Sequence, residues 1–304
     1  MWMRMSRVSN KLAGYLELLR PFTLLAPLIV SLCVMVASYT YTKTMSLSAW
    51  TLLSIILPAS LCFALLNGAS NALNQATDWQ EDKISKPYRP IPKGTVSRRE
   101  AFIISFILYS ASLILSTIIN SSFSIILCVI ALFSITYSVQ PRVKKILILN
   151  QAWVALPRGF LAIMGSWSVF GNPLQPLPLA MGCIATLFLF GGTATKDILD
   201  AQADKTVGTK TLINVLGIKK TTFISLCFMI AAFLLILPLV LFQILSSVFL
   251  PLTLLIVFSG AIGWSMLHTH HNQSYENTSA WTLMYATYFL FALGFAVITI
   301  VFAS

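Results

Sequence analysis

Long apolar runs recur along the whole chain, and they restrict its fold more than any other feature of the sequence. Only 10% of the 304 residues are charged and the mean hydropathy is +0.84. Each run is about 20 residues long, enough to cross a hydrocarbon core about 30 Å thick as a helix. Because backbone groups inside a bilayer must be satisfied internally, such spans are helices. We therefore predict an all-α polytopic membrane protein.

The runs predict nine transmembrane helices in a single domain of residues 1–304. A basic amphipathic lead-in, residues 10–20, precedes the first span, which has no clear cleavage site and is interpreted as a retained helix. Eight spans form two pseudo-repeated halves of four helices, and the ninth follows them. The spans are expected near residues 21–39, 48–73, 101–119, 122–139, 147–169, 176–195, 221–243, 246–267 and 281–303.

The basic residues are distributed asymmetrically between the connections. Eighteen of the 20 Lys and Arg lie before the first predicted span or around the connections after the second, fourth and sixth spans. Only Lys43 lies in an opposite connection, and only Arg158 lies within a span. By the positive-inside rule the N-terminus is cytoplasmic and the C-terminus is outside. The net charge of +11 is thus explained by topology, and we predict no nucleic-acid partner.

The stretch from Asn71 to Gly94 concentrates charge directly after an apolar run. Within it Asn74, Asp78 and Asp82 recur every four residues, so on one helix they share a face. An amide and two carboxylates offer the oxygen ligands that Mg²⁺ prefers, together with substrate phosphates. We predict a Mg²⁺ and diphosphate site on the cytoplasmic side.

A second acidic segment repeats this spacing four predicted spans later, as an internal duplication would. Six of the nine acidic residues of the chain lie in the two segments: Asp78, Glu81, Asp82, Asp197, Asp200 and Asp204. Facing each other, the two clusters would each hold a metal ion and clamp one diphosphate. The alternative is that they are only polar helix ends that terminate the spans.

Lys86 and Arg89 lie in a loop that three prolines stiffen. Their side chains would complete a phosphate cradle, since Arg offers a bidentate fork and Lys a point charge. The alternative is that they only set the topology.

These motifs together resemble the UbiA superfamily of intramembrane prenyltransferases. The first signature is the Asn and two Asp residues followed by KPYRPIPKG, and the second is an Asp-rich helix end followed by Gly and Thr-Leu. Further matching segments are LLRP at Leu18–Pro21, which contains Arg20, and YSVQPRVKK from Tyr137. The residues that carry the second signature are Asp197, Asp200, Asp204, Gly208, Thr211 and Leu212.

The resemblance implies nine helices around a cavity in which two Mg²⁺ ions hold a prenyl diphosphate. The prenyl group is then transferred to a hydrophobic or aromatic acceptor and diphosphate is released. The resemblance also implies that Tyr137 and one lysine, Lys144 or Lys145, contact the substrate, with Arg20 as a further substrate-binding candidate. Both lysines are kept, because the register after Pro141 allows either.

The acceptor is less well defined by the sequence. The segment KDILDAQADKTVGTKTL is more similar to the branches that act on homogentisate, chlorophyllide or archaeal glycerol lipids than to the 4-hydroxybenzoate branch. We expect a lipid-quinone precursor or an isoprenoid lipid as acceptor, in contact with membrane lipids; the sequence leaves the oligomeric state open.

Arg158 is a charged residue within a predicted span. Such a residue usually faces the interior or a cavity, where it would bind an acidic acceptor; alternatively, the span starts later and Arg158 lies near the interface. Arg158 and the carboxylates also allow a transporter, although transporter sites lie near the bilayer midplane.

Two further groups of side chains are assigned no chemistry. The five cysteines lie in apolar runs without CxxC spacing and are predicted to be small core residues. The histidines of HTHH (His268, His270 and His271) are predicted to lie in a solvated connection between the last two spans.

Overall fold

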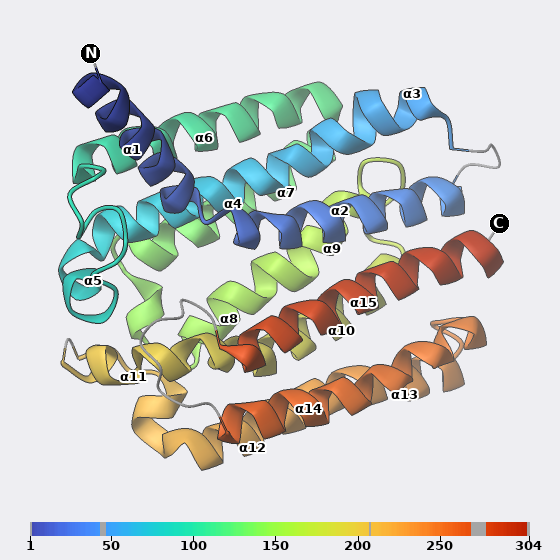
Figure 1. The fold of residues 1–304 in the computed structure, drawn as a ribbon. Coiled ribbons are helices and arrows are strands. Elements are labelled where there is room, and N and C mark those ends of the chain that lie inside the picture. Colours follow the sequence, from blue (N-terminus) through green and yellow to red (C-terminus); the bar gives the residue numbers. More distant parts are fainter. Residues whose placement is uncertain (1, 43–46, 207, 269–277, 303–304) are drawn as a thin grey trace.

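The computed structural model describes residues 2–42, 47–206, 208–268 and 278–302, and within these ranges every regular element is helical (Figure 1). The predicted all-α class is confirmed. In chain order, with η marking 3₁₀ or π-helical turns, the elements are α1 (Trp2–Leu19), α2 (Pro21–Thr42), α3 (Ala49–Thr51), η1 (Leu52–Ile56), α4 (Leu57–Thr77), α5 (Trp79–Ser85), α6 (Arg98–Ile119), α7 (Ser121–Ser138), η2 (Val143–Lys145), α8 (Leu149–Leu156), η3 (Pro157–Leu161), α9 (Ala162–Trp167), α10 (Pro176–Gly192), η4 (Thr193–Lys196), α11 (Asp197–Thr206), α12 (Leu212–Leu234), α13 (Ile236–Leu241), η5 (Ser247–Leu255), α14 (Ile256–Leu267) and α15 (Ser279–Phe302).

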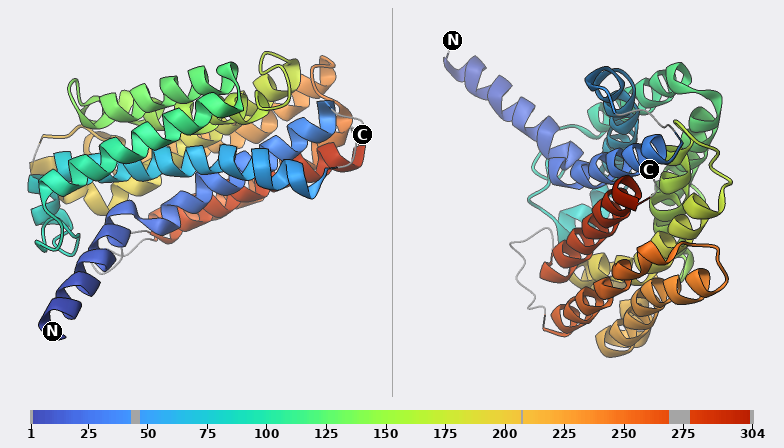
Figure 2. Two further views of the ribbon diagram at one scale, coloured as in Figure 1. Left: turned by 90° about the horizontal axis from the view of Figure 1, so that it is seen from above. Right: turned by 90° about the vertical axis from the view of Figure 1, so that its right-hand side faces the viewer.

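The long helices lie side by side along one axis and form an elongated bundle (Figures 1 and 2). The short helices α5 and α11 lie at the same end of this bundle, and α1 leads away from it at that end. Eight helical stretches of the described chain are long and apolar enough to cross a membrane: residues 21–42, 49–77, 98–119, 121–138, 176–201, 212–241, 247–267 and 279–302.

The fifth predicted span, residues 147–169, is also helical but differs in composition. It consists of α8, the π-helical turn η3 and α9. Its polar residues Asn150, Gln151 and Arg158 lower its hydropathy, which explains why it is absent from the eight. The count of nine spans and the orientation of the N-terminus therefore stay predictions.

Several helix ends differ from the predicted bounds because hydropathy does not register polar helical turns. Helix α4 continues to Thr77, and α12 begins at Leu212 with a break at Gly217 (φ 77°, ψ 164°). The Thr211 side chain caps α12 by accepting from the Asn214 N–H at 3.3 Å. The lead-in helix α1 is longer than the predicted residues 10–20.

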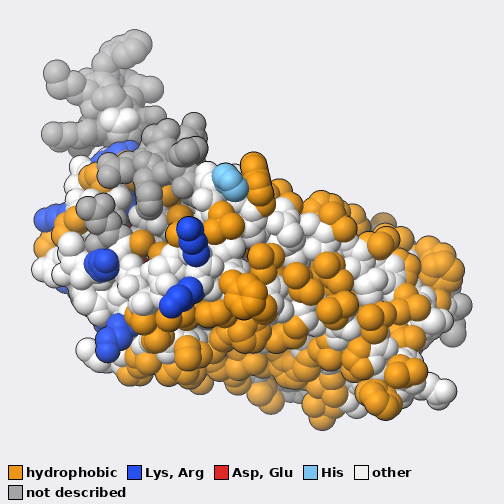
Figure 3. Space-filling model, turned by 90° about the horizontal axis from the view of Figure 1, so that it is seen from below, with side chains coloured by type: hydrophobic (Ala, Val, Ile, Leu, Met, Phe, Trp, Pro, Cys, Tyr) orange, Lys and Arg blue, Asp and Glu red, His pale blue; other side chains and the backbone are white. Residues whose placement is uncertain are grey.

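Small polar side chains join neighbouring helices in the bundle. Ser105 on α6 donates to the Ala69 carbonyl of α4 at 2.9 Å, and Ser112 donates to the Cys62 carbonyl at 2.7 Å. Such residues allow close helix packing where water is absent. Figure 3 shows a largely hydrophobic outer face with Lys and Arg side chains gathered toward one end.

The cysteine prediction is partly wrong. Cys33 and Cys62 are buried, but Cys128, Cys183 and Cys227 are exposed on the outside of the bundle. In a membrane protein the lipid-facing surface is as apolar as the interior, so an apolar run does not identify its buried side. His268 is the C-cap residue directly after α14 and is exposed, whereas His270 and His271 lie outside the described residues.

Candidate active site

A polar cavity of about 220 Å³ lies at the end of the bundle that carries α5 and α11. All site residues selected from the sequence line it, although they come from distant parts of the chain. They are Arg20, Asn74, Asp78, Asp82, Lys86, Arg89, Tyr137, Lys144, Lys145, Arg158, Asp197, Asp200 and Asp204.

The first acidic motif is bent, and the predicted single helical face is wrong. Helix α4 ends at Thr77, and Asp78 (φ −99°, ψ 15°) separates it from α5. The Thr77 hydroxyl donates to the Asn74 carbonyl at 3.0 Å, where it competes with the helical backbone. Asn74, Asp78 and Asp82 nevertheless all face the cavity.

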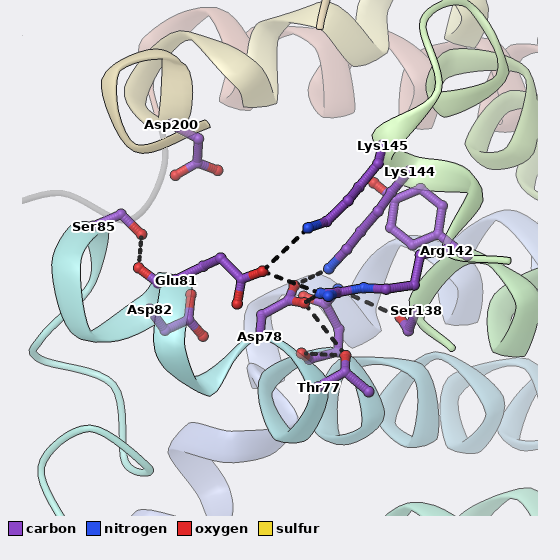
Figure 4. A network of polar contacts seen from close by, with 12 residues as sticks. Thr77, Asp78, Glu81, Asp82, Ser85, Ser138, Arg142, Lys144, Lys145 and Asp200 are labelled. Atoms are coloured by element: carbon purple, nitrogen blue, oxygen red, sulfur yellow. Dashed lines mark hydrogen bonds and ion pairs between the residues drawn. The ribbon is translucent and has the colours of Figure 1, made fainter. Parts of the chain in front are cut away.

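The Asp78 carboxylate is surrounded by cations from the segment after α7 (Figure 4). Arg142 donates to it at 2.7 Å, and Lys144 contacts its other oxygen. Arg142 also reaches Glu81 at 3.3 Å, and Lys145 lies 3.6 Å from the same carboxylate. Lys144 and Lys145 thus have different acidic partners, and burial lowers the pKa of the Lys144 ammonium against the opposing effect of Asp78.

The proline-rich loop after α5 supplies two more cations. Arg89 donates from Nη1 to both oxygens of Asp82, at 2.9 and 2.8 Å, in a pair whose residues are 6% and 4% exposed. Burial raises the pKa of the Asp82 carboxyl in spite of Arg89. Lys86 donates to Asp200 at 2.7 Å and so links the first motif to the second.

Asp197 of the second motif is held by a network that the sequence did not reveal. Lys196 donates to Asp197 at 2.9 Å, to the Tyr137 hydroxyl at 3.1 Å and to the Asn150 amide oxygen at 3.0 Å. Asn150 and Gln151 each donate to the other Asp197 oxygen at 3.4 Å. Two features of the sequence could have pointed to this network: Lys196 lies directly before the motif, and the amides Asn150 and Gln151 lie in an otherwise apolar span.

The oxygen-rich walls fit a hard divalent cation that the substrate helps to bind. Burial, followed by the nearby charges of Asp200 and Asp197, raises the pKa of Asp204 to about 7, as expected where carboxylates crowd without enough positive charge. Among the described residues no three acidic, His or Cys side chains converge on one metal position. Such a cation would take one or two carboxylates and complete its shell with phosphate oxygens and water.

A second cavity, of about 120 Å³ and mainly apolar, adjoins the polar one. Its walls include Phe63, Leu66 and Ile130. The residues that line both cavities are Ser70, Tyr137, Val154, Arg158 and Tyr285. The structure thus places Arg158 against both cavities, as the first of its two interpretations expected.

Comparisons with known proteins agree with this architecture. The model of the UbiA prenyltransferase family matches residues 24–291. Digeranylgeranylglyceryl phosphate synthase of Methanosphaera stadtmanae is 29% identical over 69% of this chain and 72% of its own. The synthase of the same name from Methanococcoides burtonii is 30% identical over 70% and 75%.

Solved structures show a similar fold. A UbiA homologue from Archaeoglobus fulgidus, bound to DMAPP and Mg²⁺, has a TM-score of 0.69 and 20% identity over 94% of this chain and 99% of its own. A structure of digeranylgeranylglyceryl phosphate synthase has a TM-score of 0.67 and 22% identity over 95% and 99%.

Proposed function

Because the chain belongs to the UbiA prenyltransferase family, we propose that it transfers a prenyl group from a prenyl diphosphate to the hydroxyl of a prenylated glyceryl phosphate. The observation that carries the proposal is that the two acidic motifs line one polar cavity. They are joined there by Lys86, which follows the first motif and donates to Asp200 of the second, 114 residues later. That cavity adjoins an apolar one, so a molecule with a charged head and an apolar tail fits the pair.

The polar cavity would bind the diphosphate and two Mg²⁺ ions. The ions would be held by Asn74 and five carboxylates, from Asp78, Asp82, Asp197, Asp200 and Asp204. Bound Mg²⁺ supplies positive charge that stabilises the leaving diphosphate. The cations that now pair with carboxylates would turn to phosphate oxygens: Lys86, Arg89, Lys144 and Lys145, with Arg20 also in the wall.

The transfer exchanges one carbon–oxygen bond for another. The bond between C1 of the prenyl group and the diphosphate oxygen breaks, and its electron pair leaves with the diphosphate. The acceptor oxygen forms a new bond to C1 and loses its proton, so the products are the prenyl ether, diphosphate and a proton. Cations preorganised around the diphosphate stabilise the charge that develops as the first bond breaks.

The apolar cavity would take the prenyl tail and keep water from the reacting carbon. The head group fixes C1 near the wall that both cavities share, where Tyr137 and Tyr285 lie. Exclusion of water matters because water would compete with the acceptor for an electron-poor carbon.

The choice of acceptor rests on the curated relatives, whose product name contains two geranylgeranyl groups, glycerol and phosphate. The aromatic lipid-quinone acceptor has no such support. The transporter alternative is disfavoured because the carboxylates lie at the ends of helices rather than midway along the bundle. We further propose that this end faces the cytoplasm and that the two motifs derive from an internal duplication.

The proposal is tested with purified protein, radiolabelled geranylgeranyl diphosphate, Mg²⁺ and three acceptors: geranylgeranylglyceryl phosphate, homogentisate and 4-hydroxybenzoate. We expect a labelled product from the first acceptor alone and none after EDTA treatment, with recovery when Mg²⁺ is restored. Full transfer in EDTA would remove the metal from the proposal. Transfer only to an aromatic acceptor would overturn the lipid assignment.

A further inference from the structure

Arg158 is a half-buried cation in the fifth predicted span, and the side chains to which it donates are neutral. Its guanidinium donates to the Tyr285 hydroxyl and, at 3.1 Å, to the Asn67 side-chain oxygen. Within the described part of the chain, every ion pair found uses a cation other than Arg158. Charged residues inside a membrane protein are usually paired with an opposite charge, so a guanidinium held only by neutral groups is suited to bind an anion.

The backbone around Arg158 is built to hold that side chain in place. Arg158 lies in the π-helical turn η3, a form of helix that is frequent at functional sites. Gly159 packs so closely on α10 that a Cβ there would lie 2.6 Å from the Thr186 nitrogen. The Tyr288 hydroxyl donates to the Arg158 carbonyl at 2.7 Å, which satisfies a backbone group of the turn.

The position of Arg158 separates it from the cations of the diphosphate site. Lys86, Arg89 and Lys144 each contact a carboxylate of the acidic motifs. Arg158 contacts no carboxylate of these motifs and lies on the wall shared with the apolar cavity. That wall is where the acceptor must come to reach C1 of the prenyl group.

We propose that Arg158, supported by Tyr285 and Asn67, is the subsite that binds the anionic group of the acceptor. This inference rests on the proposed prenyl transfer and deepens it. A guanidinium binds a phosphate or carboxylate through two parallel hydrogen bonds. In an apolar wall such a contact discriminates against a neutral acceptor, because the arginine would then remain without a countercharge.

The first experiment measures binding, so it does not depend on turnover. Radiolabelled geranylgeranylglyceryl phosphate and its dephosphorylated alcohol are titrated onto purified wild-type, Arg158→Gln, Arg158→Lys and Arg99→Gln proteins. We expect wild type to favour the phosphate, and Arg158→Gln to bind it about 10- to 150-fold more weakly, the equivalent of one charged hydrogen bond. Arg158→Lys should retain part of the preference, and Arg99→Gln, an exposed arginine, should retain all of it.

The second experiment distinguishes the acceptor phosphate from the donor diphosphate. The same proteins are titrated with a non-reactive thiolo analogue of geranylgeranyl diphosphate in Mg²⁺, and their unfolding temperatures are measured. We expect the Arg158 variants to bind the analogue within about twofold of wild type, since the donor has its own cations. Equal weakening for donor and acceptor, or a wild type that binds phosphate and alcohol equally, would overturn the inference.

The two proposals fail in different ways. A wild type that discriminates between phosphate and alcohol but transfers no prenyl group would refute the proposed function and leave the anion subsite standing. Tyr285→Phe tests whether Arg158 acts only through the structure around it, because this variant removes a neutral partner of Arg158 but keeps the charge of Arg158. We expect this variant to keep more of the preference for phosphate than Arg158→Gln; if it lost as much while remaining folded, the charge of Arg158 alone would not account for the preference.

Discussion

At the scale of single residues, three carboxylates of the polar cavity are already neutralised by cations from other segments. Asp78 binds Lys144, Asp82 binds Arg89, and Asp200 binds Lys86. These pairs are largely buried, and removal of one partner leaves an uncompensated charge. Under the proposed function, binding of Mg²⁺ and diphosphate would be an exchange, in which these cations leave the carboxylates and contact phosphate oxygens instead.

Asp78→Asn and Asp200→Asn each remove one of the charged ligands proposed for Mg²⁺ while keeping the shape of the side chain. We expect each to lower the rate of prenyl transfer about 10- to 150-fold, the equivalent of 1.5 to 3 kcal/mol. The double variant should lose less than the product of the two single losses, because both residues are proposed to act on the same leaving group. Steady-state kinetics with the acceptor panel above measures these rates.

The control for this pair is Glu17→Gln, at an exposed carboxylate that lies 3.7 Å from Lys93. It should transfer at the wild-type rate. Circular dichroism and unfolding temperature must show that both Asn variants are folded, since Asp78→Asn leaves Lys144 less well paired. Folded Asn variants within about twofold of wild type would exclude these residues from the site.

The candidate site was largely predictable from the sequence, but its contacts were not. The acidic motifs and the KPYRPIPKG loop are contiguous in sequence, so their spacing identified residues that line one cavity. Lys196 and Arg142 were not selected, because connections that are rich in cations give no reason to single out one of them. Their roles depend on packing between distant segments, such as the contact of Lys196 with Tyr137, 59 residues earlier.

At the scale of elements, the irregular turns matter more than the long helices. The bend at Asp78 and the π-helical turn η3 place polar side chains against the cavities. Neither of these two irregularities can be predicted from the hydropathy of the sequence. The long apolar helices were predictable because their length alone implies a span. The ends of α4 and α12 were not, because they are formed by polar turns that continue the helix beyond the apolar run.

The close packing of η3 on α10 makes Gly159→Ala a test of this element. A Cβ at this position would lie 2.6 Å from the Thr186 nitrogen and 2.7 Å from its Cα, so the turn must shift. We expect a loss of about 1 to 3 kcal/mol of stability, typical of overpacking, and a weaker preference for a phosphate-bearing acceptor as Arg158 moves. Thermal unfolding in detergent and the binding titration measure the two effects.

Gly260→Ala is the matched control, because it is an exposed helical glycine with no atom within 4 Å of an added Cβ. It should leave stability and acceptor preference unchanged or raise stability slightly. If Gly159→Ala behaved in the same way, the turn would be less constrained than its packing indicates.

At the scale of the whole molecule, the start of α2 and the end of α15 lie at opposite ends of the bundle. Helices α2 and α15 both begin beside the polar cavity, which is lined by Thr23 of α2 and Trp281 of α15, and α15 then runs to the far end (Figure 1). The predicted count of nine spans, an odd number, would give such a path and stays a prediction. The polar helix formed by α8, η3 and α9 supplies the crossing that composition alone does not identify.

Orientation in the membrane is tested by single cysteines in a Cys-free background. Lys83 and Lys205 are exposed near the polar cavity, and Leu174, 69% exposed, lies in the connection between α9 and α10. By the distribution of basic residues, Lys83→Cys and Lys205→Cys should react with an impermeant reagent only in opened or inverted membranes. Leu174→Cys should react in intact cells; the reverse pattern would place the site outside.

The two walls of the polar cavity belong to different halves of the chain, with Asp78 in one and Asp200 in the other. A ligand that touches both walls is consequently a non-covalent cross-link between the halves, and it can form only when they are folded against each other. Its binding free energy then adds to the free energy of unfolding, by about 2.7 kcal/mol at a ligand concentration 100 times Kd. The melting temperature thereby becomes a gauge of site occupancy, readable even in variants that have lost all turnover.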